Sequence, residues 1–525
     1  MAVDRALLRR VDISDAVALE LKSRNRMLPR RWDDAALAAE SSAVEAWLRP
    51  QLRRGPSGDK ASLVFADKLR RGVRPLHVMT LEDRVLYRGL VGLISDALPE
   101  RLRRRVPIDQ FRTAPLEVPD TEYVSLTDVA SYYEFVDHDL LCAELIAQTG
   151  EELAVDVLAD LLASVLGRRV GLPQVHSASD ILGDTYIDPV RRRMLRHGYT
   201  VFTYSDDFRI ASASLGDARA ALDRCAVEVR TLGLVLNDHK TFTYGARNYR
   251  HSLTAFSEAE QRLFADDQAA DTAASLAALD SGYGDTDGEL AAPLSLGITS
   301  PGTILEENEQ ALGPEDDEGP AEIDPARRRA AQRAWDLWEN ESEEIQGGQN
   351  AATAQALLGR ALPMLGASGD PSPLQWLSEL LRSEPALTPQ IAAYVSAYGQ
   401  IGQRARANLR SVLDDVTGGG ALSTWQGMWI AHAAGNVRRS RRSHEYEDWL
   451  ARCTTDSHDG LAATAAAALG RIGRGDPALV ASAVERVGPQ WRRLAFWGLV
   501  GLDYEQAEDT ADDELDRLLL AAAAQ

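Results

Sequence analysis

The sequence predicts an α+β protein in which a small antiparallel sheet, backed by helices, precedes an all-α C-terminal region. Short β-prone runs alternate with helical apolar spacing before about residue 250, and the spacing is almost wholly helical after about residue 326. At 525 residues the chain is too long for one ordinary core, so several domains are expected. The predicted division is an N-terminal helical segment 1–55, mixed segments 56–125 and 126–250, an acidic linker or insertion 251–325, and a helical domain 326–525.

The first two segments combine helices with one strand. Asp33 and Asp34 are expected to cap a helix that runs through Trp47 and Leu48. Residues 72–78 predict a strand entered through a glycine turn. Residues 81–91 then have the apolar spacing of a helix.

The third segment predicts a strand, two helices, a hairpin, a further helix and a final strand pair. In this order the elements occupy residues 122–130, 137–166, 179–197, 202–210, 216–232 and 234–244. Asp128 lies near the end of the first strand. If that strand neighbours the hairpin, Asp128 comes close to Asp206 and Asp207 at the hairpin turn.

The Asp206-Asp207 pair interrupts a β-prone apolar run that extends from Val201 to Ile210. Two uncompensated carboxylates are costly in such a run unless they bind a cation or find another partner. A turn that joins two strands and directs both carboxylates at Mg²⁺ resolves the conflict and points to phosphoryl transfer. The alternative is a solvated hairpin turn, because aspartate is a common turn residue.

The net charge of −22 is unevenly distributed along the chain. Residues 266–324 hold sixteen acidic side chains and no lysine or arginine, so they carry −16 of the total. This tract is expected to be disordered or loosely inserted, either as a solvated linker or as a competitor for nucleic acid. A basic patch is predicted upstream, although arginine is abundant in the whole composition. It comprises Arg49, Arg53, Arg54, Lys60, Lys68, Arg70, Arg71, Arg74, Arg84 and Arg88, followed by Arg101, Arg103, Arg104 and Arg105.

Composition indicates a soluble protein of the cytoplasm with no membrane partner. Cys142, Cys225 and Cys453 are widely spaced, so neither a disulfide framework nor a zinc site is predicted. No apolar run approaches the length of a membrane span, and the charged N-terminal residues predict no signal peptide. Residues 462–473 and 490–499 predict paired helices, for which a HEAT-like solenoid and a plain helical bundle both stay open.

Five motifs between residues 70 and 244 follow one another in a specific order. They are Arg74-Pro-Leu with Glu82-Asp-Arg-Val, then Leu126-Thr-Asp-Val-Ala-Ser-Tyr-Tyr, Gly171-Leu-Pro-Gln, Tyr204-Ser-Asp-Asp, and Leu232-Gly-Leu-Val-Leu-Asn-Asp-His-Lys-Thr. This part of the chain resembles the fingers and palm of reverse transcriptases. The resemblance covers about one third of the chain and implies fingers over 56–125 and a palm with the polymerase site over 126–250.

The resemblance implies an acidic site for two Mg²⁺ ions. Asp128 and Asp206 would bridge the ions, and Asp207 would be the third acidic group. Lys240 matches the lysine near the leaving pyrophosphate, where an ammonium group can stabilise or protonate the departing oxygen. For Asp128 alone, a strand-end aspartate is the alternative.

The resemblance also implies contacts to the nucleotide. Tyr133 would be the aromatic ring that senses the sugar and favours deoxynucleotides, with a core aromatic as the alternative. Arg71 and Arg74 would hold the triphosphate, because a guanidinium group binds phosphate through two hydrogen bonds. Gln174 would lie in the template-side loop. Weaker phosphate candidates are Lys60 and Lys68.

Two departures from the family pattern concern the loop after Gln174 and the hairpin that carries Asp206 and Asp207. Val175 and His176 follow Gln174, whereas the family has a glycine there. Because a β-branched residue lacks the backbone freedom of glycine, the loop is expected to contact template or substrate differently. His176 is interpreted either as a phosphate or base contact or as a surface turn histidine. Ser205 replaces the commoner alanine.

A polymerase core joined to a long helical region is similar to the abortive-infection and defence-associated reverse transcriptases of bacteria. This resemblance implies RNA-directed or template-independent DNA synthesis from dNTPs in antiphage defence. The expected partners are RNA or DNA, a noncoding RNA, DNA primed on a protein hydroxyl, and further copies of the chain. A retroelement-type reverse transcriptase and a helical interaction scaffold with a degenerate polymerase core are the alternatives.

Overall fold

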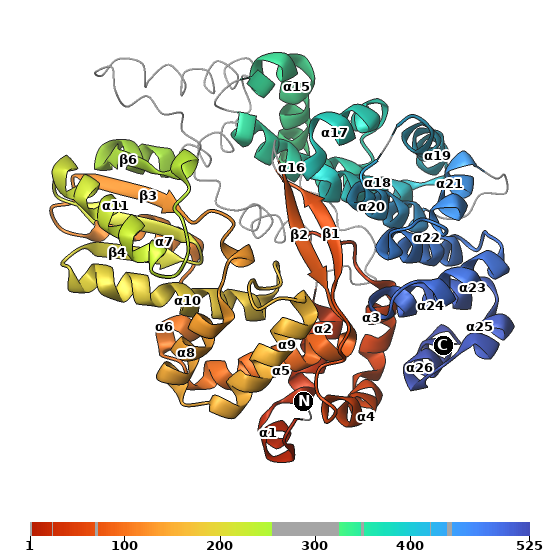
Figure 1. Cartoon of the computed structure of the whole chain (residues 1–525). Coiled ribbons are helices and arrows are strands. Elements are labelled where there is room, and N and C mark those ends of the chain that lie inside the picture. The colour runs from red at the N-terminus through yellow and green to blue at the C-terminus, as the bar shows by residue number, and fades with distance from the viewer. Residues whose placement is uncertain are drawn as a thin grey trace.

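The computed structural model describes residues 3–23, 25–68, 72–254, 325–347, 351–420, 422–437 and 444–524. Arg71 and the acidic tract 266–324 lie outside these described residues. The described chain is mostly helical and contains two small antiparallel sheets, which agrees with the predicted α+β class. In Figure 1 the larger sheet lies on the left, the smaller one in the centre and the C-terminal helices on the right.

The N-terminal segment consists of short helices rather than one long one. They are α1 (Arg5–Arg10), α2 (Ile13–Lys22), α3 (Trp32–Leu37), the 3₁₀ turn η1 (Ala38–Glu40) and α4 (Ser41–Leu52). The prediction that Asp33 and Asp34 cap a helix through Trp47 was wrong. Both aspartates lie in the first turn of α3 and form ion pairs with Arg31, because a buried carboxylate requires a partner.

The smaller sheet is an antiparallel hairpin of β1 (Ser62–Asp67) and β2 (Val73–Val78), with Ala66 opposite Arg74. β2 matches the strand predicted over 72–78, whereas β1 was missed because its apolar run is short and flanked by charged residues. The helices α5 (Leu81–Ala97), α6 (Glu100–Arg103) and α7 (Ile108–Glu117) follow. α5 begins at Thr80, whose hydroxyl accepts a hydrogen bond from the Asp83 amide.

The larger sheet has the strand order β4-β5-β3-β6, and its neighbouring strands are antiparallel. Its strands are β3 (Tyr123–Asp128), β4 (Thr200–Tyr204), β5 (Asp207–Ser212) and β6 (Phe242–Gly245). Along these strands, successive side chains point to opposite faces of the sheet. Phe208 and Ile210 join the main core, whereas Val124 and Leu126 pack with Leu116 of α7.

The helices α8 (His138–Thr149), α9 (Glu152–Leu166), α10 (Ser177–Arg196) and α11 (Leu215–Arg230) complete this half of the molecule. α10 contacts β4, and α11 contacts β3 and β5. Two predictions were wrong here. The single helix over 137–166 is broken by Gly150, whose φ of 71° ends α8. The strand pair over 234–244 contains only β6, because Leu236 forms an isolated bridge with Val129.

The C-terminal helices stack in two rows. The bounds are α15 (Pro325–Gly347), α16 (Ala351–Ser368), η4 (Ser372–Trp376), α17 (Leu377–Ser383), η5 (Pro385–Leu387), α18 (Thr388–Ile401), α19 (Gln403–Gly418), α20 (Thr424–Gly435), α21 (Glu445–Cys453), α22 (Asp459–Ile472), α23 (Pro477–Arg486), α24 (Pro489–Leu502), α25 (Tyr504–Thr510) and α26 (Glu514–Ala523). The even-numbered helices α16 to α26 contact one another in succession, and odd-numbered helices α19, α21, α23 and α25 pack beside them. This stacking is consistent with helical repeats.

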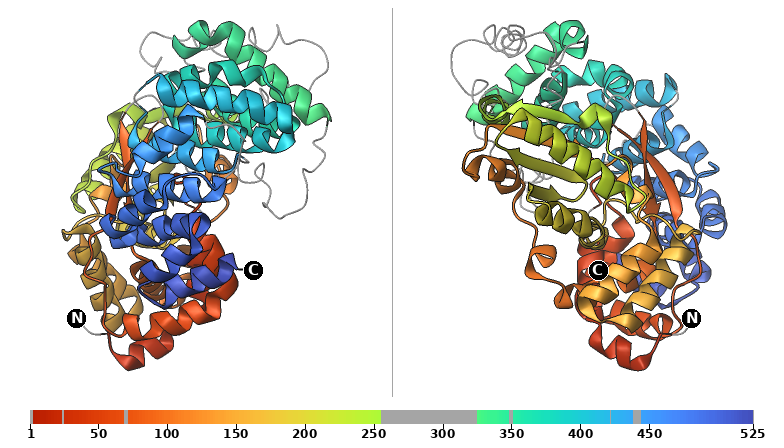
Figure 2. Two further views of the ribbon diagram at one scale, coloured as in Figure 1. Left: turned by 90° about the vertical axis from the view of Figure 1, so that its right-hand side faces the viewer. Right: turned by 60° about the vertical axis from the view of Figure 1, so that its left-hand side comes forward.

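The C-terminal helices close back onto the N-terminal half. α20 and α22 contact β1, and α24 and α26 contact α3. Figures 1 and 2 show the last helices, in blue, beside the red N-terminal helices. At this junction Trp32 stacks on His432 with ring centroids 4.5 Å apart, and the fully buried Trp425 donates a hydrogen bond to the carbonyl of Met27. The smaller sheet is thus held between the two halves.

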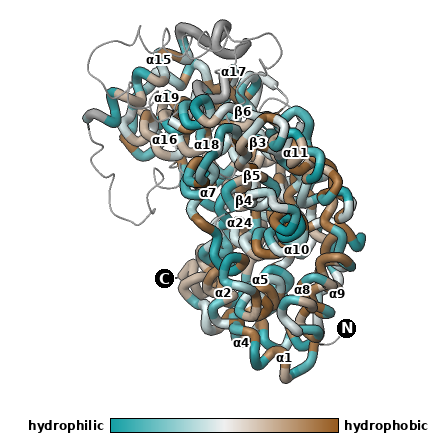
Figure 3. Tube along the Cα trace, turned by 90° about the vertical axis from the view of Figure 1, so that its left-hand side faces the viewer, coloured by the Kyte–Doolittle hydropathy of each residue, from teal (hydrophilic) through white to brown (hydrophobic). Residues whose placement is uncertain are grey.

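Hydropathy is mixed along the helices. Figure 3 shows hydrophilic and hydrophobic residues interspersed along the chain trace. Within the described ranges, no helix combines the length and the apolar character that crossing a membrane requires.

Candidate active site

Three aspartates meet at one end of the larger sheet. Asp128 is the last residue of β3 and lies directly opposite Asp207, the first residue of β5. Directly opposite residues of an antiparallel pair have neighbouring side chains. Asp206 lies in the β4–β5 turn, and its carbonyl accepts a hydrogen bond from the Val129 amide at 3.1 Å. The sequence prediction placed these aspartates together only if the two strands were neighbours, and they are.

The segment before β6 places the ammonium group of a lysine beside Asp128. Lys240 lies in the 3₁₀ turn η3 (Asp238–Lys240), and its Nζ is 2.9 Å from Oδ2 of Asp128. Asn237 fixes this segment, because its amide donates to the Asp128 carbonyl at 2.7 Å and its Nδ2 to Oδ2 at 3.3 Å. Burial lowers the pKa of Lys240, but the charge and hydrogen bond of Asp128, together with the charges of Asp206 and Asp207, raise it above its ordinary value. Lys240 therefore carries its charge at neutral pH.

The carboxylates repel one another. Burial raises the pKa of Asp206 well above its ordinary value, and Asp128 and Asp207 raise it further. Burial also raises the pKa of Asp207 to about 6; Arg209 opposes this shift and Asp128 adds to it. Carboxylates that destabilise one another's charge form a place where a further cation is favourable.

A cavity of about 860 Å³, here called the chamber, opens in front of the aspartates. Asp128, Asp206, Asp207 and Lys240 line it together with Lys68, Arg74 and His77 of the hairpin and its turn. Burial lowers the pKa of Arg74, while Asp206 acts in the opposite direction. The lining of the chamber therefore contains both anionic and cationic side chains.

The donor set suits a hard divalent cation in ligand type and in charge. Mg²⁺ prefers carboxylate oxygens and usually keeps water or substrate oxygens in its shell. Among the described residues, no group of three or more His, Cys, Asp or Glu side chains forms a ready-made metal site. In the described part of the chain, Asp128, Asp206 and Asp207 therefore lie near one another without forming a three-ligand metal site by themselves.

Tyr133 and Gln174 also line the chamber. Tyr133 is half-buried, and its carbonyl accepts a hydrogen bond from the Leu172 amide at 2.7 Å, which docks the loop that carries Gln174. Val175 follows with a φ of 59°. A β-branched residue is strained in this left-handed region. Val175 therefore keeps the left-handed backbone conformation that glycine would adopt at this position, and differs from glycine only in its side chain.

His176 is neither a free surface histidine nor an available phosphate ligand. Its Nε2 is 3.1 Å from Oε1 of the buried Glu20, and its Nδ1 accepts a hydrogen bond from the Ala178 amide at 3.2 Å. Arg88 also contacts Glu20 and donates to Ser177 Oγ at 2.9 Å. The interpretations of His176 as a surface turn histidine and as a phosphate contact are corrected, because both of its ring nitrogens have partners within the protein, whereas a contact with a base stays a prediction.

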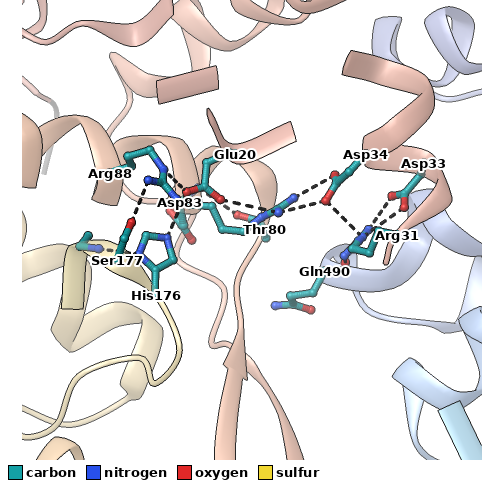
Figure 4. Close-up of polar contacts among 12 residues, drawn as sticks. Glu20, Arg31, Asp33, Asp34, Thr80, Asp83, Arg88, His176, Ser177 and Gln490 are labelled. Atoms are coloured by element: carbon teal, nitrogen blue, oxygen red, sulfur yellow. Dashed lines mark hydrogen bonds and ion pairs between the residues drawn. The ribbon is translucent and has the colours of Figure 1, made fainter. Parts of the chain in front are cut away.

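The contacts around Glu20 extend to the C-terminal helices. Arg84 lies 3.7 Å from Glu20 and donates two hydrogen bonds of 3.0 Å to Asp34. Arg31 lies 3.7 Å from Asp34 and donates to the carbonyl of Gln490 at 2.6 Å. Figure 4 shows this row of charged groups crossing from the loop at His176 to Gln490 of α24. The loop that lines the chamber and the C-terminal helices are therefore linked through buried charges.

Sequence reasoning missed the residues that hold the β4–β5 turn. Asp184 Oδ1 accepts a hydrogen bond from the Ser205 amide at 2.9 Å, and Asp184 Oδ2 accepts one from Arg105 Nε at 2.5 Å. Asp180 accepts a hydrogen bond from the Tyr133 hydroxyl at 2.7 Å. The available signal was the spacing of Asp180 and Asp184, which places both on one face of α10.

The basic candidates have separate positions. Arg74 and Lys68 lie at the chamber, whereas Lys60 lies against Gly167 and does not line it. Arg71 falls outside the described residues. The site therefore brings together every predicted residue that the structure describes, apart from the weak candidate Lys60.

Comparisons with known proteins find similarity only among solved structures. No protein-family model and no curated protein matches the sequence. Among solved structures, telomerase from Candida tropicalis in complex with a fragment of telomeric RNA aligns with a TM-score of 0.29 and 10% identity. The alignment covers 75% of this chain and 68% of the telomerase chain. A similarity of this size does not identify the fold or the function.

Proposed function

We propose that the chain is a nucleotidyltransferase of the polymerase type, which extends a DNA strand from dNTPs with two Mg²⁺ ions. The observation that carries the proposal is the meeting of Asp128, Asp206 and Asp207 with Lys240 at the chamber. Phosphoryl transfer needs hard oxygen ligands for metal ions and positive charge at the leaving group. Both are supplied by these four side chains.

In this proposal each group has a chemical task. Asp128, Asp206 and Asp207 would hold the metal ions, which when bound would activate the attacking hydroxyl and neutralise charge on the leaving pyrophosphate. Lys240 gives a proton or its charge to the leaving group. Arg74 contacts the triphosphate, and on the family resemblance Arg71 shares that task.

The remaining chamber residues are assigned to nucleotide and template. Tyr133 lies beneath the sugar and excludes a 2′-hydroxyl, and Gln174 contacts the base or template. Template use is proposed to be either RNA-directed or template-independent. The template-independent form is favoured by Val175 and His176, because a bulky, anchored loop replaces the glycine that the family uses at this point.

We further propose, on the family resemblance and the long helical region, that the enzyme acts in the cytoplasm in antiphage defence. Its proposed partners are RNA or DNA, a noncoding RNA, protein-primed DNA and further copies of the chain. A retroelement-type reverse transcriptase is the alternative within the same chemistry. A helical scaffold with a degenerate core is the alternative outside it, and the pairing of Lys240 with Asp128 argues against degeneracy.

The decisive experiment replaces Asp206→Asn together with Asp207→Asn. Because the carboxylates are the proposed metal ligands, incorporation of labelled dNTPs should fall by about 10²–10³-fold or more. Chelation of Mg²⁺ should abolish incorporation by the unaltered protein. Addition of Mg²⁺ should raise the thermal unfolding midpoint of the unaltered protein and leave that of the double variant nearly unchanged.

A matched control is Asp156→Asn together with Asp160→Asn, which removes two exposed carboxylates from α9, away from the chamber. This variant should keep full incorporation. Incorporation that survives the Asp206/Asp207 change would exclude the proposed chemistry. Phage restriction that survives it, in cells where the unaltered protein restricts phage, would favour the scaffold.

A further inference from the structure

The hydroxyl group of Tyr133 is fully engaged within the protein. It lies 2.7 Å from Oδ1 of Asp180 and 2.8 Å from Oγ of Ser205. A carboxylate can only accept, so the phenol donates to Asp180 and accepts from the Ser205 hydroxyl. No part of this hydroxyl's ordinary hydrogen-bonding capacity is left for a substrate, and the surface that Tyr133 offers the chamber is its ring.

Both partners of that hydroxyl are fixed by further contacts. The Ser205 amide donates to Asp184 Oδ1 at 2.9 Å. Arg105 joins the two acidic side chains of α10, because it donates to Asp184 Oδ2 at 2.5 Å and lies 3.5 Å from Oδ2 of Asp180. Arg105 also lies over the Tyr204 ring, 5.1 Å from its centroid. The turn that carries Asp206 and the Tyr133 hydroxyl therefore share one rigid support.

The other parts of Tyr133 are fixed as well. Its carbonyl accepts from the Leu172 amide, and its ring meets the buried ring of Tyr132 edge-on with centroids 5.4 Å apart. α10 passes close by, since a Cβ added to Gly183 would lie 3.6 Å from a ring carbon of Tyr133. The one conformational freedom that remains, swinging the ring about its side-chain torsions, is opposed by the bonds to Asp180 and Ser205.

We propose that Ser205 and Asp180 are positioning residues that hold the Tyr133 ring as a rigid wall and thereby set the selection of deoxynucleotides over ribonucleotides. The inference rests on the proposed polymerase function. A ring can exclude one hydroxyl group only if it cannot move aside by the width of that group. The serine hydroxyl, which the sequence carries where alanine is commoner in the family, thus takes part in sugar selection without touching the sugar.

The test measures kcat/KM for a dNTP and for the matching NTP in the full-length protein and in Ser205→Ala and Tyr133→Phe. Both variants keep the aromatic ring and remove the bond between the two hydroxyl groups. The ratio of the two kcat/KM values should fall about three- to tenfold in Ser205→Ala, as expected for the loss of one buried hydrogen bond, and at least as much in Tyr133→Phe, which also removes the bond to Asp180. The double variant should fall no further than the larger single change, because both substitutions remove the same restraint.

Ser125→Ala is the matched control. Ser125 Oγ lies 2.9 Å from Oγ1 of Thr243, so this variant also removes a hydroxyl–hydroxyl bond from the larger sheet, but away from the chamber. Its thermal midpoint should shift about as much as that of Ser205→Ala, while its selectivity ratio stays that of the unaltered protein. If Ser205 had a purely structural role, Ser205→Ala would lower the thermal unfolding midpoint and leave the ratio of kcat/KM for dNTP and NTP unchanged.

Three results contradict the inference in different ways. Incorporation with an unchanged ratio in both Ser205→Ala and Tyr133→Phe removes the inference and leaves the polymerase function in place. Absence of incorporation by the unaltered protein with either kind of nucleotide removes the polymerase function and the inference together. A double variant whose loss equals the product of the two single losses shows separate effects and also contradicts the shared restraint.

Discussion

Glu20 is a carboxylate that the chain buries almost completely, with its side chain 3% exposed. Burial alone raises the pKa of a carboxyl group, but His176, Arg84 and Arg88 act in the opposite direction. The result is a pKa lowered from 4.5 to about 2. Glu20 is therefore ionised in the folded protein under conditions where the unfolded chain would bind a proton.

The first prediction concerns acid stability. The folded-state pKa of Glu20 is depressed, so its contribution is complete above about pH 4.5 and is lost as the pH falls toward about 2. Glu20→Gln should lower the free energy of unfolding at pH 7 by about 3 kcal/mol, since a tenfold change in proton affinity is worth about 1.4 kcal/mol. Urea unfolding at several pH values measures this.

The same titration distinguishes Glu20 from an ordinary glutamate. Between pH 4.5 and 2 the unaltered protein should lose stability more steeply than Glu20→Gln. Glu152→Gln, which changes an exposed residue at the start of α9, should retain the steep slope. Equal slopes in Glu20→Gln and the unaltered protein would mean that Glu20 is not the ionised partner of this cluster.

Single residues were predictable where their chemistry was unusual. Asp206 and Asp207 stood out because charges are rare in a β-prone run, and Lys240 because lysine is rare in this chain. Asp180 and Asp184 offered only their spacing of four residues, which is ordinary for acidic residues on a helix. The partner of His176 was equally hidden, because Glu20 lies far from it in sequence and only the packing of α2 brings them together.

The loop after Gln174 contains a strained backbone conformation at Val175. Val175 has a φ of 59°, and left-handed backbone costs a non-glycine residue about 1–2 kcal/mol. Contacts of His176 and Ser177 hold the loop in place despite that cost. The loop conformation is thus imposed from α2 and α5 rather than chosen locally.

The second prediction follows from this strain. Val175→Gly should stabilise the protein by about 0.5–1 kcal/mol, because relief of the left-handed strain exceeds the entropy cost of glycine. Val227→Gly is the control, since Val227 is exposed in the interior of α11 and its replacement should destabilise by a similar amount. Urea midpoints measure both changes. A destabilised Val175→Gly would show that valine packing outweighs the backbone strain.

The helix pair α22 and α24 approaches through small residues. A Cβ added to Gly470 would lie 2.3 Å from the carbonyl oxygen of Gly498, and one added to Gly498 would lie 2.3 Å from the carbonyl oxygen of Ala466. Real side chains do not approach backbone this closely. The spacing of these two helices therefore depends on glycine at the crossing.

The third prediction is that Gly470→Ala destabilises the protein by about 1–3 kcal/mol, because the helices must move apart. Gly92→Ala is the matched control. Gly92 lies inside α5, and an added Cβ meets no atom within 4 Å, so alanine should stabilise by up to about 1 kcal/mol through helix propensity. Thermal unfolding compares the two. Equal effects from the two alanines would contradict the close crossing.

Helices and strands could be predicted where the spacing of apolar residues stayed uniform along the whole element. α5, α10, α11 and the β4–β5 hairpin lie close to their predicted positions because their apolar spacing is uniform. The prediction of one long helix over 137–166 was wrong because Gly150, in a left-handed conformation, ends α8 although the apolar pattern continues past it. β1 failed because its pairing with β2 and its cover by α20 and α22, rather than its own residues, make it a strand.

The two halves of the molecule support each other at the hairpin. A two-stranded sheet is marginal by itself. Here Trp491 donates to Ser62 Oγ at 2.9 Å, His458 Nε2 lies 2.8 Å from the Leu63 carbonyl, and Ser423 donates to Asp67 at 3.2 Å. The hairpin that carries Arg74 to the chamber is therefore positioned from the C-terminal helices.

The fourth prediction tests this dependence. Trp425→Ala removes a fully buried ring and its hydrogen bond to Met27, and should destabilise the protein by about 3–5 kcal/mol. Hydrogen exchange should accelerate across residues 25–31 and 62–78. Trp376→Ala is the control, because Trp376 packs on Trp338 inside the C-terminal array. Exchange over 62–78 that is unchanged in Trp425→Ala would show a hairpin that is stable without the array.

The packing of the C-terminal helices against the N-terminal half could not be predicted from the sequence. The helical character after residue 326 was evident from apolar spacing, but the choice between a bundle and stacked rows depends on which helices become neighbours. The contacts between α24 and α3 join segments several hundred residues apart, and no local pattern records them.

The packing of Trp32 against His432 and Gly435 sets an order of events during synthesis. The ribosome synthesises α3 before the surface on which it rests, because His432 follows Trp32 by 400 residues (432 − 32). Until then, the apolar side of α3 must stay in contact with water or with a chaperone. The protein reaches this arrangement only after His432 and Gly435 have been synthesised, so a product terminated before them would lack a firmly seated α3.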